Sequence, residues 1–343
     1  MRQSNFELLR IVSMMMVILW HFIVRCIIDI PDGALITEYQ CTPEGMGGGV
    51  ILPCSFLCIA VNLFVLISGY WGIKLTIKGI LKLYFLCLFY NLLAFSVTSY
   101  MDGFNIKHLV KCFLITRTDN WFFPAYFWLM FFAPICNSCL RNVDLKQMRV
   151  IVGLIVILNV FSGFVLGYNA NSNGYSVIHL IMIYLIGGYI RKADINIKNN
   201  KCLICYVIFA VVNAFLCFVY VKITHRNGMY LYNYNNPIII AQSVFVFLFF
   251  KNIHLESKIV NKFAMTVVAV LLIQDVVLRD LMIENLKSYL HEGYFEFLQY
   301  SAFWFIFFFT AAYLIEQLRI PITNKMIDKI VGLLPKDIVS FKL

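Results

Sequence analysis

The stretch NFELLRIVSMMMVILWHFIVR, residues 5–25, is apolar enough and long enough to cross a bilayer as a helix. It nevertheless carries Arg10 and His21 within its length. These two residues are eleven positions apart, so at 100° per residue they return to within about 20° of the same direction. The rise per residue places His21 roughly 16 Å further along the axis than Arg10. Both side chains are therefore expected on one face, with Glu7 pairing with Arg10 on the same stripe.

Ionisable side chains inside a bilayer are costly unless they face protein or water, and they usually mark functional sites. The alternative is that Arg10 extends to the membrane interface and that His21 only hydrogen-bonds to another helix. Histidine is the side chain best suited to accept and return a proton near neutral pH. The aligned pair favours the functional interpretation, with His21 as the catalytic candidate.

The rest of the chain has the composition of an integral membrane protein. Its 343 residues are 61% hydrophobic and 13% charged, whereas a soluble domain is about half apolar and a quarter charged. Mean hydropathy is +0.81. The net charge of +10 is spread through short loops, which argues against a nucleic-acid surface. No polar block of domain size interrupts the apolar runs, so residues 1–343 are predicted to form a single membrane domain with no soluble domain appended.

The apolar runs predict an all-α, polytopic bundle of about ten transmembrane helices, with nine or eleven left open. The two shortest runs, near 175–190 and 236–250, are also compatible with half-helices. The predicted spans are 6–28, 50–71, 80–100, 122–140, 149–168, 175–190, 203–221, 236–250, 263–279 and 298–318.

Lysine and arginine in the loops predict the orientation, because cytoplasmic loops carry an excess of both. With both termini in the cytoplasm, the larger set falls on the cytoplasmic side: Arg2, Lys74, Lys78, Lys82, Arg141, Lys146, Arg149, Arg191, Lys192, Lys198, Lys201, Lys251, Lys258, Lys262, Arg319, Lys325, Lys329, Lys336 and Lys342. The smaller set falls outside: Arg25, Lys107, Lys111, Arg117, Lys222, Arg226, Arg279 and Lys287.

Two further patterns have competing interpretations. The outer segments GYNANSNGYS (167–176) and HRNGMYLYNYNN (225–236) are rich in asparagine and tyrosine. They fit either an interfacial aromatic belt or contacts with carbohydrate. Two C-x-x-C pairs, Cys136/Cys139 and Cys202/Cys205, have the spacing of zinc ligands. Neither pair lies in a glycine-rich knuckle, so no metal is expected.

Four stretches occur in an order and spacing that resembles the acyltransferase-3 family of bacterial membrane proteins, which transfer acyl groups to carbohydrates. The first is Arg10, ten intervening residues and His21. The second is LFVLISGYW (63–71), which is similar to the family's Ser-Gly-Phe/Tyr segment at Ser68, Gly69 and Tyr70. The others are NWFFPAYFWLMFFAPICN (120–137), with matches at Trp121, Tyr126, Pro134 and Asn137, and YLIGGYIRK (184–192).

The sequence departs from the family's pattern in two places. An arginine-rich cluster often follows the Ser-Gly-Tyr segment, but here that loop has Lys74, Lys78 and Lys82. Lysine supplies a point charge without bidentate recognition of phosphate. A His-Pro dipeptide frequent near the end of the family's domain is replaced by Gln274-Asp275. A role for that histidine is therefore not transferred, and Gln274 is assigned only a supporting place.

The resemblance implies a multi-pass acyltransferase of the bacterial inner membrane, with an acyl-coenzyme A donor, usually acetyl-coenzyme A, arriving from the cytoplasm. The acceptor would be a hydroxyl of a glycan or lipid-linked oligosaccharide at the outer face. Arg10 and the three lysines would hold or orient the donor. His21 would deprotonate the hydroxyl or carry the acyl group itself. Ser68 would either support the carbonyl oxygen of the acyl group or only satisfy a backbone hydrogen bond. Gly69, Tyr70, Trp121 and Tyr126 would have supporting roles.

Other functions remain to be weighed against this one. A transporter or flippase of polysaccharide or lipid-linked glycan is the principal alternative, although no internal repeat is evident. A glycan polymerase would not explain the spacing of Arg10 and His21. Among the other histidines, His179 is the only rival candidate, because it lies near the outer end of a predicted helix.

Overall fold

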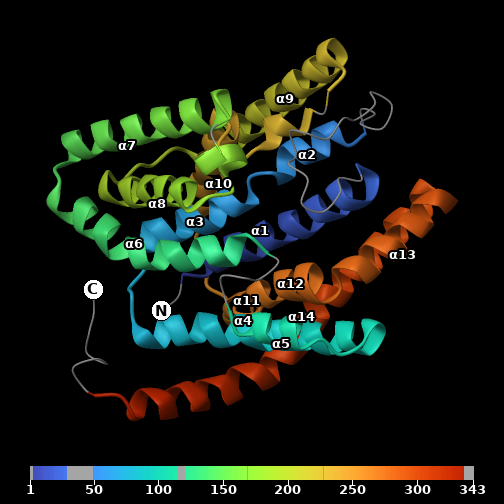
Figure 1. The fold of residues 1–343 in the computed structure, drawn as a ribbon. Helices are drawn as coiled ribbons and strands as arrows, with labels where there is room; N and C mark the ends of the chain where they lie inside the picture. Colours follow the sequence, from blue (N-terminus) through green and yellow to red (C-terminus); the bar gives the residue numbers. More distant parts are fainter. Residues whose placement is uncertain (1–2, 29–48, 115–119, 168, 227, 336–343) are drawn as a thin grey trace.

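The computed structural model describes residues 3–28, 49–114, 120–167, 169–226 and 228–335. Every element assigned in these ranges is a helix, which confirms the predicted all-α class. Figure 1 shows the helices packed side by side in a bundle. In chain order they are α1 (Ser4–Phe22), η1 (Ile23–Ile27), α2 (Ile51–Leu57), α3 (Ala60–Trp71), α4 (Ile77–Asp102), α5 (Ile106–Cys112), α6 (Phe122–Asn142), α7 (Leu145–Asn159), η3 (Val160–Val165), η4 (Asn169–Gly174), α8 (Val177–Lys192), α9 (Asn199–Thr224), η5 (Gly228–Tyr232), α10 (Pro237–Lys251), α11 (Lys258–Ala264), α12 (Val267–Leu272), η6 (Ile273–Val277), α13 (Arg279–Glu292) and α14 (Tyr294–Gly332).

Eight helical stretches of the described chain are long and apolar enough to cross a membrane, so the protein is a multi-pass membrane protein. They coincide with eight of the predicted spans: Ser4–Ile27, Ile51–Trp71, Ile77–Asp102, Phe122–Asn142, Leu145–Val165, Asn199–Thr224, Lys258–Val277 and Tyr294–Gly332. The other two predicted spans are α8 and α10, with 16 and 15 residues. At 1.5 Å per residue each covers about 24 Å or less, short of a hydrocarbon core of about 30 Å.

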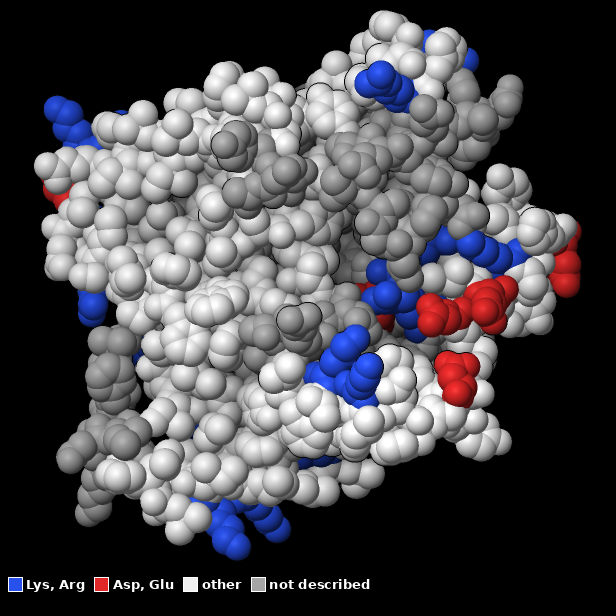
Figure 2. Space-filling model, viewed as in Figure 1, with Lys and Arg blue, Asp and Glu red and all other residues white. Residues whose placement is uncertain are grey.

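The surface carries the apolar side chains that a lipid-facing bundle needs. Leu154, Phe215 and Phe303, on α7, α9 and α14, are all more than half exposed. Most of the face in Figure 2 is uncharged, and toward its right-hand end basic and acidic side chains lie beside one another. Apolar exposure of this extent is expected where lipid replaces water as the solvent.

The start of α1 and the described end of α14 lie at the same end of the bundle (Figure 1). The start of α1 is fixed there, because Asn5 donates to the backbone oxygen of Phe250 at 3.1 Å and Ser4 accepts from the Ser257 amide at 2.9 Å. Lys78 and Asp328, near the start of α4 and the end of α14, form an ion pair at 2.6 Å. The start of α1 and the end of α14 are thus on one side of the bundle, and the charge asymmetry of the loops predicts that this side is cytoplasmic.

The closest helix crossing joins two of the sequence motifs. A Cβ added to Gly69 on α3 would lie 2.0 Å from the backbone oxygen of Tyr184 on α8. One added to Gly187 would lie 2.4 Å from the backbone oxygen of Leu66. Small residues let the backbones of membrane helices approach in this way. Gly69 is therefore a packing residue, and it holds α3 against α8.

Gly69→Ala is expected to destabilise the protein by about 1–3 kcal/mol, because the new methyl group would overlap backbone that has no rotamer to change. Thermal unfolding in detergent would measure the effect. Gly153→Ala is the control, since nothing lies within 4 Å of that Cβ position. Equal melting temperatures for the two variants would contradict the proposed crossing.

Four asparagines of the outer segments, Asn171, Asn173, Asn233 and Asn235, are buried and join the two segments by hydrogen bonds. Asn233 donates to the side chain of Asn173 at 2.8 Å, and Asn235 donates to the backbone of Asn171 at 3.0 Å. His179 is fully buried, with Nε2 2.9 Å from the amide oxygen of Asn62. Buried amides must satisfy one another in this way. These buried amides form a layer that links the outer ends of the helices, and His179 is part of this layer.

Candidate functional site

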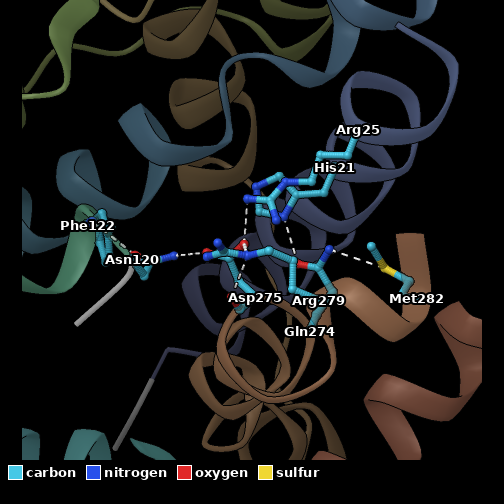
Figure 3. Close-up of polar contacts among 8 residues, drawn as sticks. All are labelled: His21, Arg25, Asn120, Phe122, Gln274, Asp275, Arg279 and Met282. Carbon is cyan, nitrogen blue, oxygen red and sulfur yellow. Dashed lines mark hydrogen bonds and ion pairs between the residues drawn. The ribbon is translucent and has the colours of Figure 1, made fainter. Parts of the chain in front are cut away.

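His21 lies in the interior of the bundle beside the π-helical turn η6. Its Nδ1 is 2.7 Å from Oε1 of Gln274, a residue 253 positions away in the sequence (Figure 3). Gln274 is itself fully buried. The residue that replaces the family's histidine is therefore the direct partner of His21.

The hydrogen bonds around Gln274 assign the tautomer of His21. Nε2 of Gln274 lies 3.5 Å from the sulfur of Met282, which can only accept a hydrogen bond. The amide oxygen therefore faces His21 and accepts a hydrogen bond from Nδ1–H. In the neutral ring this leaves the lone pair on Nε2. Among the described residues Nε2 has no hydrogen-bond partner, so it is available as a base.

A second pair lies beside the first, because Arg25 is four residues after His21 and Asp275 directly follows Gln274. Arg25 Nη2 contacts Oδ1 of Asp275 at 2.6 Å, and Asn120 donates to Oδ2 of the same carboxylate (Figure 3). Arg279 donates through Nε to the Asp275 backbone oxygen at 2.9 Å and lies 3.5 Å from Oδ1. Asp275 is 3% exposed, so its charge is neutralised by these arginines rather than by water.

The segments η1 and η6, which carry Arg25 and Asp275, are both π-helical. The amide of Ile28 bonds to the oxygen of Ile23 at 3.0 Å, and the amide of Leu278 bonds to Ile273 at 2.9 Å. Each is an i to i+5 bond. A π-turn adds one residue to a helical turn and redirects the side chains around it, and such turns are frequent at functional sites. They bring the polar residues of η1 and η6 to face one another.

His21 borders a small cavity of about 60 Å³. Since water occupies about 30 Å³ in the liquid, the cavity holds roughly two water-sized groups. Its walls are mostly apolar, and His21 and Asn120 are among the few polar side chains. The cavity is lined by Met14, Val17, Trp20, His21, Leu57, Cys58, Ala60, Val61, Phe64, Asn120, Trp121, Phe122, Tyr234, Val268 and Leu271.

A larger cavity of about 610 Å³ lies toward the end of the bundle where α1 begins, and Glu7 and Arg10 line it. Its volume is within the range of small-molecule sites. Three cations line it, Arg10, Lys82 and Arg319. Phe64, Phe122 and Val268 line both cavities, so the space beside Arg10 adjoins the space beside His21 at these side chains.

Besides Lys82, four residues predicted from the sequence line the larger cavity: Glu7, Arg10, Ser68 and Tyr126. Arg10 Nη1 lies 2.5 Å from Oε1 of Glu7, as the helical stripe predicts. The Arg10 side chain stays one-third exposed, whereas that of Glu7 is 6% exposed. Ser68 donates to the Phe64 backbone oxygen at 2.9 Å and lies 3.1 Å from the Tyr126 hydroxyl. Ser68 and Tyr126 therefore form a hydroxyl pair in the wall of the cavity.

Arg319 lines the larger cavity, which the sequence did not predict. It was counted there as a residue of the cytoplasmic tail. It lies within α14 and contacts Glu316 through two nitrogens, each at 2.6 Å. Tyr90 donates to the same carboxylate at 2.9 Å. Such bidentate pairs are rigid. A helix of 39 residues that extends past the apolar span was not evident from hydropathy alone.

Of the other predicted residues, some line a cavity wall, some pack between helices and some are exposed on the surface. Lys74 and Lys78 are exposed and are not among the residues lining the larger cavity, and Lys78 pairs with Asp328. Tyr70 stacks on Phe6, with ring centroids 5.2 Å apart. Trp121 lines the small cavity.

Arg25 and Asp275 were also missed as site residues. Arg25 was counted only among the cations of the outer side, and Asp275 entered only as part of a departure from the family's pattern. The four-residue step from His21 to Arg25 was the one available signal. For metals, no three His, Cys, Asp or Glu side chains in the described part of the chain gather as ligands.

The fold and this site define a multi-pass helical membrane protein with a histidine between an outer pair of charges and an inner cationic cavity. A family model described as an acyltransferase domain, that of the acyltransferase-3 family, matches residues 3–316. The chain belongs to this family and is a membrane acyltransferase. Comparison with curated proteins and with solved structures gave no match.

Proposed function

We propose that the protein transfers an acetyl group from acetyl-coenzyme A to a hydroxyl of an exported or cell-envelope glycan, in the bacterial inner membrane. The observation that carries this proposal is the meeting of the two cavities at Phe64, Phe122 and Val268. The cationic cavity suits a phosphorylated donor, and the histidine cavity suits the reacting groups. A donor and an acceptor arriving from opposite sides would meet between them.

The chemistry assigns a distinct part to each group. The acceptor oxygen attacks the thioester carbonyl while His21 Nε2 takes the hydroxyl proton. The carbon–sulfur bond then breaks, and the departing coenzyme A sulfur receives the proton from His21. Gln274 holds the ring through Nδ1, so it is a positioning residue. An acyl-histidine intermediate uses the same free nitrogen and remains an alternative route.

The size of the small cavity supports a short acyl group. A cavity of about 60 Å³ has room for a group of about the size of an acetyl group. On the donor side Lys82, Arg10 and Arg319 are the cations that line the larger cavity and would face the phosphates. Lys74 and Lys78 are not part of this proposal.

The protein in lipid nanodiscs, supplied with radiolabelled acetyl-coenzyme A and glycan from its own envelope, is expected to label the glycan. Lys82→Gln should raise KM for acetyl-coenzyme A by about tenfold or more, because a charge-assisted contact to phosphate is worth about 1.5–3 kcal/mol. Lys78→Gln is the matched control and should change KM less than twofold, since Lys78 pairs with Asp328. Absence of labelling with every acceptor fraction would contradict the proposed function, and equal KM values for the two variants would contradict the donor site.

A further inference from the structure

The larger cavity is too small to enclose a whole coenzyme A thioester. Gly79 and Asn324 line it, near the start of α4 and toward the end of α14, so it extends to the end of the bundle where α1 begins. Sites of roughly 300–1,000 Å³ enclose a drug-sized ligand, and an acyl-coenzyme A is about twice the size of such a ligand. A cavity of about 610 Å³ is therefore matched to only part of the donor.

The charges around the larger cavity balance little more than a single phosphate group. Arg10 is paired with Glu7 at 2.5 Å. Arg319 is paired with Glu316 through two nitrogens, each at 2.6 Å. Lys82 has no carboxylate partner in the described part of the chain, so it carries the one net positive charge of this group. A coenzyme A thioester carries about four negative charges near neutral pH, and most of them are not balanced here.

The length of α1 between Arg10 and His21 matches one part of the donor. His21 lies about 16 Å further along the helix axis than Arg10. In a phosphopantetheine thioester about 13 bonds separate the sulfur from the first phosphorus, and an extended chain advances roughly 1.2 Å per bond, which gives about 16 Å. Arg10 lines the larger cavity, and His21 lines the small cavity that adjoins it. A thioester beside His21 therefore places the first phosphate level with Arg10, in the cavity that Lys82 also lines.

We propose that the larger cavity binds only the phosphopantetheine arm of the donor, with the first phosphate at Lys82, and that the adenosine 3′-phosphate stays outside the cavity. This inference rests on the proposed function, because it concerns which part of the donor the same site recognises. Cavity volume, net charge and the length of α1 each select the same portion of the molecule. An acetyl group carried on phosphopantetheine alone is then nearly as good a donor as acetyl-coenzyme A.

Binding of three thioesters tests this assignment apart from chemistry. Full-length His21→Ala protein in nanodiscs of zwitterionic lipid is titrated calorimetrically with acetyl-coenzyme A, S-acetyl-phosphopantetheine and S-acetyl-pantetheine. The Kd values of the first two are expected to agree within about fivefold, whereas loss of the phosphate should raise Kd by about tenfold or more. A larger gap between the first two probes would mean that the site binds the nucleotide, which overturns the proposal.

Lys82 is tested by adding Lys82→Gln to the same protein. This substitution should raise the Kd of S-acetyl-phosphopantetheine by about tenfold and leave that of S-acetyl-pantetheine unchanged, because only the first probe carries a phosphate. Lys78→Gln is the matched control and should change neither value, since Lys78 pairs with Asp328. An equal loss of both probes in the Lys82 variant would mean that Lys82 shapes the cavity without contacting phosphate, which overturns the proposal.

Transfer by the wild-type protein distinguishes this inference from the proposed function. S-acetyl-phosphopantetheine is expected to label the glycan with a kcat/KM within about fivefold of that for acetyl-coenzyme A. Transfer from acetyl-coenzyme A without transfer from S-acetyl-phosphopantetheine would contradict this inference alone. Failure of both donors with every acceptor fraction would contradict the proposed function instead.

Discussion

His21→Ala is expected to lower kcat for acetyl transfer by about 10²–10⁴-fold, because the hydroxyl would lose its only positioned proton acceptor. Radiolabel transfer in nanodiscs measures the rate, and gel filtration checks folding. The KM for acetyl-coenzyme A should change little, since His21 does not line the larger cavity. The loss would therefore appear in kcat.

The control for His21 is His291→Ala, which removes an exposed imidazole at the end of α13. Its activity should match that of the wild type. Normal transfer by well-folded His21→Ala protein would rule out the site described above. His179→Ala is a different case, because His179 is fully buried among asparagines and its loss should lower stability before activity.

Ala60→Val is expected to reduce kcat at least 100-fold without weakening donor binding. The two added carbon atoms are each close to the size of a water molecule, so together they occupy most of the 60 Å³ beside His21. The substitution fills a cavity, so the free energy of unfolding should not fall. Acyl transfer and acetyl-coenzyme A binding, measured on the same preparation, separate the two effects.

Ala302→Val is the matched control, because Ala302 lies on the exposed face of α14. It should leave kcat and donor binding unchanged. A fully active Ala60→Val enzyme would mean that the reacting groups do not enter the small cavity. Loss of donor binding together with activity would mean that the two cavities are not separate compartments.

Much of the fold follows from local sequence. Hydropathy depends on consecutive residues, so the apolar runs located the eight membrane-spanning stretches of the described chain together with α8 and α10, but not α5 or the polar helix α13. The ends of the helices were predicted less well. The run at 298–318 gave no sign that α14 continues to Gly332, because its last turns are amphipathic rather than apolar.

The sequence also determined the inner part of the candidate site. Helical geometry alone places Glu7, Arg10 and His21 on one face of α1, and each of them borders one of the two adjoining cavities. Ser68 and Tyr126 were found only through their place in the family's motifs. Their contact across α3 and α6 is a product of packing.

Only the tertiary structure decided which groups surround His21. The bond to Gln274 and the pair of Arg25 with Asp275 join residues some 250 positions apart, and no local pattern specifies such contacts. Packing also decided which of Lys74, Lys78 and Lys82 lines the larger cavity, because a lysine side chain reaches a cavity only if its helix is turned toward that cavity. Periodicity fixes the face on which a residue lies, whereas helix packing fixes what that face meets.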